Sequence, residues 1–438
     1  MSDKKISIAY LYNNYYKKSI VLKRFANVFS LDILVRASNL FLLPVYLKLM
    51  TQDEFGLYGY ILAIIGIFSQ VLNFGLYLAQ VKLYHDFTGE ERRSLIFSIN
   101  VILISSLILF IVPIYFFKLD RFIITILFSH EINYPGYRSL VFLAIIVSVY
   151  VLMIQNYLMT SEKIKKYQLY NFLKLIFVNS IVISALWARN SDGVMIRLKY
   201  GYITELVLLM AFGVYYIKQM NTRFNLNYAR KAIKISIPAM LSALLAMVFN
   251  FSDKFILEKY GNFKDLAIYN LGILLATIIT LVFSSFQTVF LPFFFKEKDV
   301  TKNFNKTKAI LIRMFGIFIL LGIFIIAAAR LAFIFHIFQP KYFTVLMILP
   351  ILLLTQISQT MVLLLSNYIV YFEIVYVGTI IVFILSPLNI WLNLYFIPRY
   401  NIYGASFSAL LISVISFVIY YYFIKWKCTS KAITETIK

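Results

Sequence analysis

Long apolar stretches recur along the whole chain, and short polar turns separate them. The hydrocarbon core of a bilayer is about 30 Å thick, so about 20 consecutive apolar residues are enough for a helix to span it. This pattern predicts an all-α polytopic membrane protein with about twelve transmembrane helices. The predicted spans are residues 26–48, 56–80, 95–117, 138–160, 168–188, 199–217, 234–253, 266–290, 307–330, 343–367, 374–396 and 402–424.

Two further apolar stretches, residues 122–128 and 331–338, are too short to span. We expect them to extend neighbouring helices or to lie along the interface. The loops are too short to form a soluble domain. The predicted organisation is an N-terminal arm, a six-helix bundle, a linker, a second six-helix bundle and a tail. These segments cover residues 1–25, 26–217, 218–233, 234–424 and 425–438.

An internal repeat relates the two predicted bundles. Residues 23–60 resemble residues 234–271 at a constant offset, with the GLY turn at 56–58 matching AIY at 267–269, 211 positions later. The alternative is a chance similarity between two apolar segments. Parallel six-helix halves with a substrate site between them are a transporter architecture. We therefore expect two pseudo-symmetric, MATE-like bundles.

The basic residues lie mostly on alternate loops. Of the 42 Lys and Arg residues, 26 fall on the side of the N-terminal arm, 13 on the opposite side and three inside spans. Because cytoplasmic loops carry the excess of Lys and Arg, this distribution predicts that both termini are cytoplasmic. The net charge of +23 therefore indicates membrane topology and not nucleic-acid binding.

The composition excludes several classes of protein. With 61% hydrophobic and 14% charged residues, the chain differs from soluble domains, which carry about 25% charge. One cysteine, Cys428, leaves no intramolecular disulfide, and the three histidines lack the spacing of metal ligands. No P-loop, zinc motif or nucleophile elbow is present. We expect no enzymatic activity, no metal and no cofactor.

The first predicted span carries Asp32 and Arg36, one helical turn apart and able to pair on one face. One interpretation is a self-neutralised structural pair. The other is that this helix lines a hydrated cavity, where Arg36 binds an anion and Asp32 tunes or releases it. Intramembrane charges are rare and usually functional. We favour the cavity.

Lys174 and Arg313 lie just inside the predicted cytoplasmic ends of their spans. Each could extend its long side chain to the interface. Together with Arg36 they would form a cationic vestibule that binds phosphate oxygens, because the guanidinium group donates two parallel hydrogen bonds.

Other polar residues occur at or inside the spans. Asp253 could pair with Lys254 at the interface or, like Asp32, serve in gating or ion coupling. Glu205 and Glu373 are expected at the interface. Among many amides, the candidates for saccharide binding are Gln70, Asn73, Asn250 and Gln287. The structural alternative for amides is interhelical hydrogen bonding, worth about 0.6 kcal/mol on average.

Four segments in order resemble the polysaccharide flippases of the Wzx type. They are DEFGLYGY at 53–60, NFGLYLAQ at 73–80, SIPAMLSALLAMVFNFSDKFIL at 236–257 with LAIYNLG at 266–272, and NIWLNLYFIPRYNIYGASFSALL at 389–411. Asn73 replaces an acidic residue of that family and Asn401 replaces its usual glycine.

The resemblance implies a fold like that of the multidrug/oligosaccharidyl-lipid/polysaccharide exporters, with a central cavity between two bundles. It also implies a function. Such flippases move undecaprenyl-diphosphate-linked oligosaccharide repeat units to the outer leaflet of the bacterial inner membrane, for O-antigen, lipopolysaccharide or capsule. Proton or sodium antiport is implied too, and a polysaccharide polymerase and a chain-length regulator are candidate partners. The lipid tail is expected to remain in the bilayer.

Three alternatives remain from the residues themselves. A drug/cation antiporter of the sister family carries cationic cargo, which a basic cavity repels. A membrane O-antigen polymerase or glycosyltransferase typically needs a large external loop or an acidic metal-binding cluster, and the sequence has neither. A structural scaffold would leave Arg36 unexplained.

Overall fold

The computed structural model of the protein describes residues 38, 40–189 and 191–436. All regular elements in this part of the chain are helical. A short helix, Leu40–Leu49, comes first. It is followed by α3 (Gln52–Asn73), α4 (Leu76–Leu83), α5 (Gly89–Phe116), α6 (Asp120–Leu127), α7 (Tyr134–Thr160), α8 (Ile164–Leu173), the π-helical turn η2 (Lys174–Val178), α9 (Asn179–Ala188), α10 (Gly193–Ile217), α11 (Leu226–Tyr260), α12 (Phe263–Lys296), α13 (Val300–Ile334), the 3-10 turn η3 (Pro340–Tyr342), α14 (Val345–Tyr371) and α15 (Val375–Thr436).

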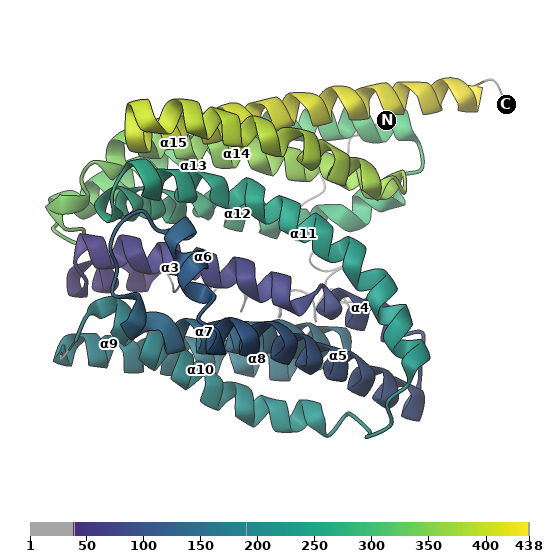
Figure 1. The fold of residues 1–438 in the computed structure, drawn as a ribbon. Coiled ribbons are helices and arrows are strands. Elements are labelled where there is room, and N and C mark those ends of the chain that lie inside the picture. Colours follow the sequence, from purple (N-terminus) through teal and green to yellow (C-terminus); the bar gives the residue numbers. More distant parts are fainter. Residues whose placement is uncertain (1–37, 39, 190, 437–438) are drawn as a thin grey trace.

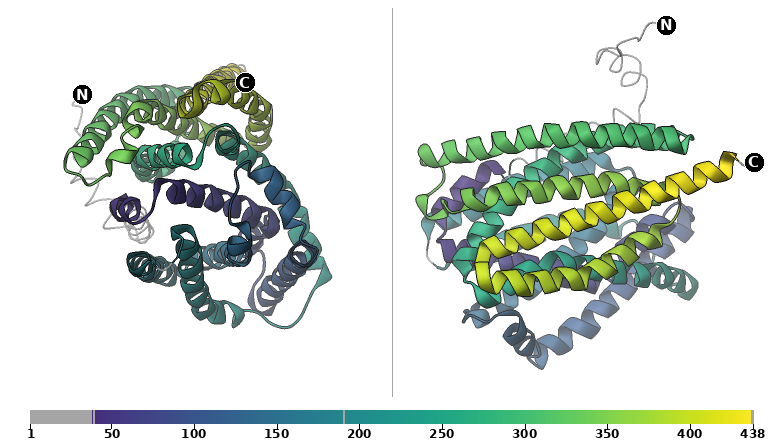
Figure 2. Two further views of the ribbon diagram at one scale, coloured as in Figure 1. Left: turned by 60° about the vertical axis from the view of Figure 1, so that its left-hand side comes forward. Right: turned by 90° about the horizontal axis from the view of Figure 1, so that it is seen from above.

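Many of these helices are long and apolar enough to cross a membrane. Within the described ranges nine qualify, or ten when the two parts of α11, bent by 41°, are counted as one span. The helix α15 consists of two helices joined at Asn401, and its two arms run back along each other (Figure 2). The predicted all-α membrane fold is confirmed, while the number twelve stays a prediction.

Besides the predicted span that bends within α11, two more predicted spans are interrupted. The span predicted at 56–80 breaks at Phe74 and Gly75, which have φ of 53° and 69°. The break separates α3 from α4, and the side-chain oxygen of Asn73 accepts the backbone N–H of Tyr77 across it. The span predicted at 168–188 contains the π-helical turn η2. The short apolar stretch at 122–128 forms most of α6, and α13 extends into the one at 331–338.

The helices form two groups that meet along α3, α4, α11 and α12. Figure 1 shows α3 to α10 in the lower part of the view and α12 to α15 in the upper part, with α11 running between them. In the interface α3 packs against α12, and α11 packs against α3, α4 and α5. We call α3–α10 the first half and α11–α15 the second half. The contact between the halves therefore involves the helices that the repeat predicted as equivalent.

Close packing of α3 on α12 supports the repeat. A Cβ atom on Gly56 would lie 3.0 Å from the backbone nitrogen of Ala267 and 1.8 Å from the carbonyl oxygen of Phe263. One turn later, a Cβ atom on Gly59 would lie 2.5 Å from the side-chain nitrogen of Asn270. Gly56 and Ala267, like Gly59 and Asn270, are separated by the repeat offset of 211 residues. Equivalent residues meet in this way where a pseudo-two-fold axis passes between two helices.

The outer surface of the bundle is apolar. On α13, for example, Ile312, Leu320 and Phe324 are exposed along one face. Large contiguous apolar surface of this kind is rare on soluble monomers. It is the surface that lipid tails would cover.

Candidate functional site: a cavity between the two halves

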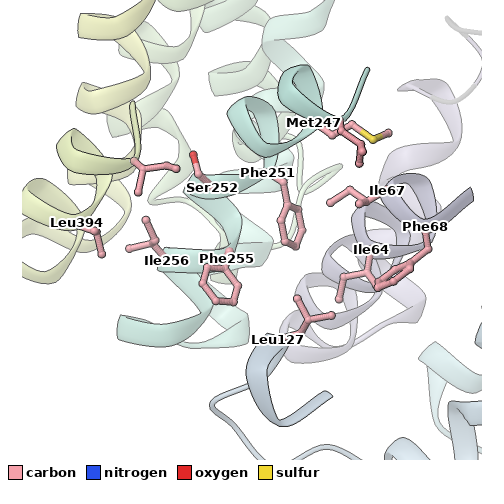
Figure 3. A pocket seen from close by; sticks show the side chains of 12 residues that line it. Ile64, Ile67, Phe68, Leu127, Met247, Phe251, Ser252, Phe255, Ile256 and Leu394 are labelled. Atoms are coloured by element: carbon pink, nitrogen blue, oxygen red, sulfur yellow. The ribbon is translucent and has the colours of Figure 1, made fainter. Parts of the chain in front are cut away.

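A cavity of about 410 Å³ lies between α3 and α11. Figure 3 shows Phe251 and Phe255 of α11 on one side and Ile64 and Ile67 of α3 on the other, with Leu127 of α6 below them. The lining residues are Ile64, Ile67, Phe68, Leu127, Leu244, Met247, Phe251, Ser252, Phe255, Ile256, Ile390 and Leu394. Ser252 contributes the only polar side chain among them, so this part of the cavity is apolar.

A second cavity of about 450 Å³ adjoins the first and shares Ile67, Met247 and Phe251 with it. Its remaining lining residues are Ala63, Gly66, Gln70, Ala243 and Asn250. Two of the amides proposed from the sequence for saccharide binding, Gln70 of α3 and Asn250 of α11, therefore face the same space. We call the two cavities together the central cavity.

Helical spacing and small side chains create this space. On α3, Ala63, Gly66, Ile67 and Gln70 recur at three- and four-residue intervals and so share one face of the helix. A Cβ atom on Gly66 would meet nothing within 4 Å. The small residues thus leave room where the halves would otherwise touch. No charged side chain lines the central cavity in the described part of the chain.

The halves are held together at the end of the bundle that the Lys and Arg count assigns to the outside; we call it the outer end. The Glu258 carboxylate of α11 accepts the backbone N–H groups of Ser129 and His130 from the α6–α7 loop, at 2.9 and 3.1 Å. The Nδ1 atom of His130 also lies 3.1 Å from the carboxylate. This contact, which we call the outer clasp, was not predicted, because a single carboxylate near a helix end looks like an interfacial residue.

Further contacts close the same end. Gln52 donates to the carbonyl oxygen of Lys264 at 3.3 Å, and Lys341 Nζ donates to that of Met50 at 3.0 Å. Tyr60 of α3 stacks on Phe251 with ring centroids 5.4 Å apart, while its hydroxyl donates to the carbonyl oxygen of Leu127. These contacts join the two halves on the outer side of the central cavity.

Other predicted residues lie away from this cavity. Asn73 is buried at the break between α3 and α4. Gln287 of α12 donates to the Asn367 side chain of α14 at 3.3 Å, which is the interhelical role considered as its alternative. Asp253 accepts the Tyr269 hydroxyl at 2.6 Å and lies 3.9 Å from Lys254 Nζ. None of the three lines the central cavity.

Lys174 is paired within the first half. Its Nζ donates to the carboxylate of Glu205 on α10, which the Tyr170 hydroxyl also contacts. The Glu205 side chain is packed inside the protein and is 8% exposed, while that of Lys174 is 38% exposed. The interfacial position expected for Glu205 stays a prediction. The sequence does contain the signal for this pair, since two opposite charges occur in neighbouring spans.

Arg313 lies on the second half, in a separate groove of about 330 Å³ between α12 and α13. Lys174 and Arg313 therefore do not share a cavity and do not form one cationic vestibule in the described structure. Asp32 and Arg36 lie outside the described residues. The anion-binding role of Arg36 stays a prediction.

A buried polar network lies beside the central cavity. Asn389 donates to the carbonyl oxygen of Phe249 at 2.7 Å and to Ser252 Oγ at 3.2 Å. Asn393 donates to Ser252 Oγ at 3.0 Å, and Ser408 donates to the side-chain oxygen of Asn393. Phe249 begins the second part of the bent α11. Asn389 thus supplies a donor beside the bend, and through Asn393 and Ser408 the network joins α11 to both arms of α15.

Comparisons with known structures place the fold. The chain is similar to the lipid II flippase MurJ in an inward closed conformation, with a TM-score of 0.74, 16% identity, and 93% of this chain and 88% of that chain covered. The chain is also similar to an inward-facing MATE-family multidrug transporter of the MOP superfamily, with a TM-score of 0.64 and 14% identity. This match covers 91% of this chain and 98% of that chain. A MOP superfamily transporter from Pyrococcus furiosus matches with a TM-score of 0.60 and 12% identity, and the match covers 93% of this chain and 95% of that chain. These similarities confirm the expected MATE-like architecture.

These fold neighbours are flippases and transporters, not enzymes. No curated protein matches the chain. A family model described as "polysaccharide biosynthesis protein" matches residues 21–298, which is more than half of the sequence. The chain therefore belongs to the polysaccharide biosynthesis protein family.

Proposed function

We propose that this protein is a flippase for saccharide repeat units linked to undecaprenyl diphosphate. In this proposal it moves them from the inner to the outer leaflet of the bacterial inner membrane, with both of its termini in the cytoplasm. The observation that carries the proposal is the central cavity between the two halves, where Gln70 and Asn250 lie on mostly apolar walls. Family membership and the MurJ-like fold support it.

The lining suits an uncharged saccharide. Amide groups donate and accept hydrogen bonds, so Gln70 and Asn250 can replace the water that sugar hydroxyls lose on entry. The apolar side chains of Met247 and Phe251 offer surface to the C–H faces of sugar rings. A cationic drug, the cargo of the alternative antiporter, would find no carboxylate in the described lining.

The diphosphate would be recruited at the cytoplasmic end. The loops assigned to this end carry most of the basic residues, including Lys82, Arg92 and Arg93. Such a surface attracts anions and raises their local concentration. In the proposal Arg36, on the first predicted span, binds the diphosphate where the substrate enters the central cavity. Asp32 and Asp253 are the candidate residues for coupling to H⁺ or Na⁺.

Transport would follow from alternating access of the two halves. They correspond to the bundles predicted at residues 26–217 and 234–424, although α11 begins at Leu226, inside the predicted linker 218–233. Opening the outer end requires the outer clasp and the contacts of α3 with α12 to separate. Closing it again returns the central cavity to the cytoplasmic side.

Deleting the gene tests the proposal. Lipid-linked repeat units should accumulate on the cytoplasmic face of the membrane, and the wild-type gene should restore their export. A gene carrying both Gln70→Leu and Asn250→Leu should restore less than a tenth of the wild-type export. Gln287→Leu, the same kind of substitution outside the central cavity, should restore export fully. Accumulation of unpolymerised units on the outer face would instead identify a polymerase and overturn the proposal.

A further inference from the structure

We infer that the first isoprene units of the substrate's hydrocarbon tail, next to the diphosphate, are held inside the first half, in an apolar side cavity that adjoins the central cavity. This inference rests on the proposed function and adds to it where the tail lies. The tail would then accompany the saccharide through the protein instead of remaining wholly in the bilayer.

The side cavity has a volume of about 170 Å³ and lies between α3, α5, α6 and α7. Ile111 of α5, Ile124 of α6 and Val141 of α7 are typical of its lining. Its polar lining groups, Asp120 and Tyr134, already bond each other at 2.6 Å, and Arg138 also donates to Asp120 at 2.6 Å. The side cavity therefore offers a ligand apolar surface.

The side cavity adjoins the apolar part of the central cavity. Both are lined by Ile64 and Phe68 of α3 and by Leu127 of α6. Figure 3 shows these three side chains together at the edge of the central cavity. The apolar part in turn adjoins the part with Gln70 and Asn250. Three adjoining spaces thus run from the amides of Gln70 and Asn250 to a mostly apolar end.

The side cavity lies beside the amides along α3. Its lining on this helix runs from Ile64 to Leu72, so it reaches past the level of Gln70. The start of a lipid tail can therefore enter the side cavity from the level of the amides.

The short helix α6 forms the side wall of this path. Ile123, Ile124 and Leu127 face the side cavity, while Phe122 and Ile126 are 70% and 54% exposed. On this side the side cavity is separated from the outer surface of the bundle by α6, a helix of eight residues. Displacing α6 would open the side cavity directly to the hydrocarbon of the bilayer, which gives the tail a lateral route in.

Photo-crosslinking of the full chain in vesicles tests the inference. The probe is undecaprenyl phosphate with a diazirine on the isoprene unit next to the phosphate. It should label peptides from α5, α6 and α7 that line the side cavity. Val141→Phe, which fills the side cavity, should reduce this labelling at least tenfold. Val207→Phe, on the exposed face of α10, should leave it unchanged.

Labelling confined to outward-facing residues of the wild-type chain, or equal labelling of Val141→Phe, would overturn the inference. Wild-type labelling decides the question even if Val141→Phe does not fold. Export of lipid-linked repeat units, measured in the same vesicles, separates the two proposals. Export with no labelling of the side cavity removes the tail site and leaves the flippase function, and labelling with no export does the reverse.

Discussion

The carboxylate of Glu258 in the second half accepts the backbone N–H of His130 in the first half at 3.1 Å. The Glu258 side chain is 1% exposed, so backbone donors take the place of water around its charge. Hydrogen bonds to charged groups contribute about 1.5–3 kcal/mol each. The outer clasp is therefore a main contact that must break before the central cavity can open outward.

Replacing Glu258 with glutamine should make the outer end open more readily. The amide keeps the shape of the side chain but loses the charge that holds the N–H groups of Ser129 and His130. A loss of about 1.4 kcal/mol corresponds to a tenfold change in the population of the open state. We expect about tenfold faster labelling of Ile64→Cys by a membrane-impermeant maleimide added outside, in a Cys428→Ser background.

Glu297→Gln is the matched control, since Glu297 pairs with Lys306 at the opposite end of the bundle. It should leave the labelling rate unchanged. An unchanged rate in Glu258→Gln would show that the outer clasp does not control access to the central cavity.

Gly56→Ala should force α3 and α12 apart. Its Cβ atom would meet the carbonyl oxygen of Phe263 at 1.8 Å, and backbone on a packed helix cannot move aside cheaply. We expect a loss of stability of about 1–3 kcal/mol, seen as a lower thermal unfolding temperature in detergent. Gly59→Ala should cost less, because its close neighbour is a side-chain amide that can rotate.

Gly213→Ala is the control for the glycine substitution itself. Nothing lies within 4 Å of the added atom, so the gain in helix propensity should stabilise the chain by up to about 1 kcal/mol. Equal unfolding temperatures for Gly56→Ala and Gly213→Ala would contradict the close contact of α3 and α12.

The Lys174–Glu205 pair predicts an asymmetric response to substitution. Lys174→Met leaves a buried carboxylate that keeps the Tyr170 hydroxyl but has no opposite charge among its described partners, which should cost about 3 kcal/mol. Glu205→Gln leaves the less buried partner, Lys174, whose long side chain can extend toward the membrane interface, and this should cost about 1 kcal/mol. Thermal unfolding of both single variants and of the double variant measures this. The double variant should be more stable than Lys174→Met alone, and the reverse order of the single variants would count against the pair.

Asp120 should make the attachment of α6 sensitive to acid. Burial alone would raise the pKa of Asp120, but hydrogen bonds from Arg138 and Tyr134 outweigh it and lower that pKa below its ordinary value. A lowered pKa in the folded state means that the contribution to stability is complete above about pH 4 and is lost as the pH falls further. Hydrogen exchange of α6 should therefore accelerate below about pH 4 in the wild-type chain. In Asp120→Asn it should be fast already at neutral pH, with no such acid step, and the same acid step in both chains would exclude this role.

Much of the fold could be predicted because the length of an apolar span and the helical period can both be recognised from a short stretch of sequence. The turn at Asn401 separates the two arms of α15 where the pattern placed a boundary between two spans. The break at Phe74 and Gly75 was missed, because apolar residues continue on both sides of it. Gly75 itself was the available signal, since a glycine tolerates the positive φ found there.

The candidate site could be predicted only in part. Gln70 and Asn250 stand out as amides inside spans, and the structure places both in the central cavity. Asn73 and Gln287 gave the same signal but lie elsewhere, because the sequence does not reveal which face of a helix turns toward the other half. The partners of Glu258 and Lys174 depend on how neighbouring helices are aligned, which no local pattern encodes.

Cross-linking the outer end tests the central claim most directly. Asp53 and Lys264 approach within 4.0 Å across the two halves. Cysteines at these positions in a Cys428→Ser chain can be joined by a short bis-methanethiosulfonate reagent. In vesicles containing lipid-linked repeat units, we predict that the cross-linked chain stops export and that reduction restores it. Export at the uncross-linked rate with the halves held together would contradict the alternating movement of the two halves around the central cavity.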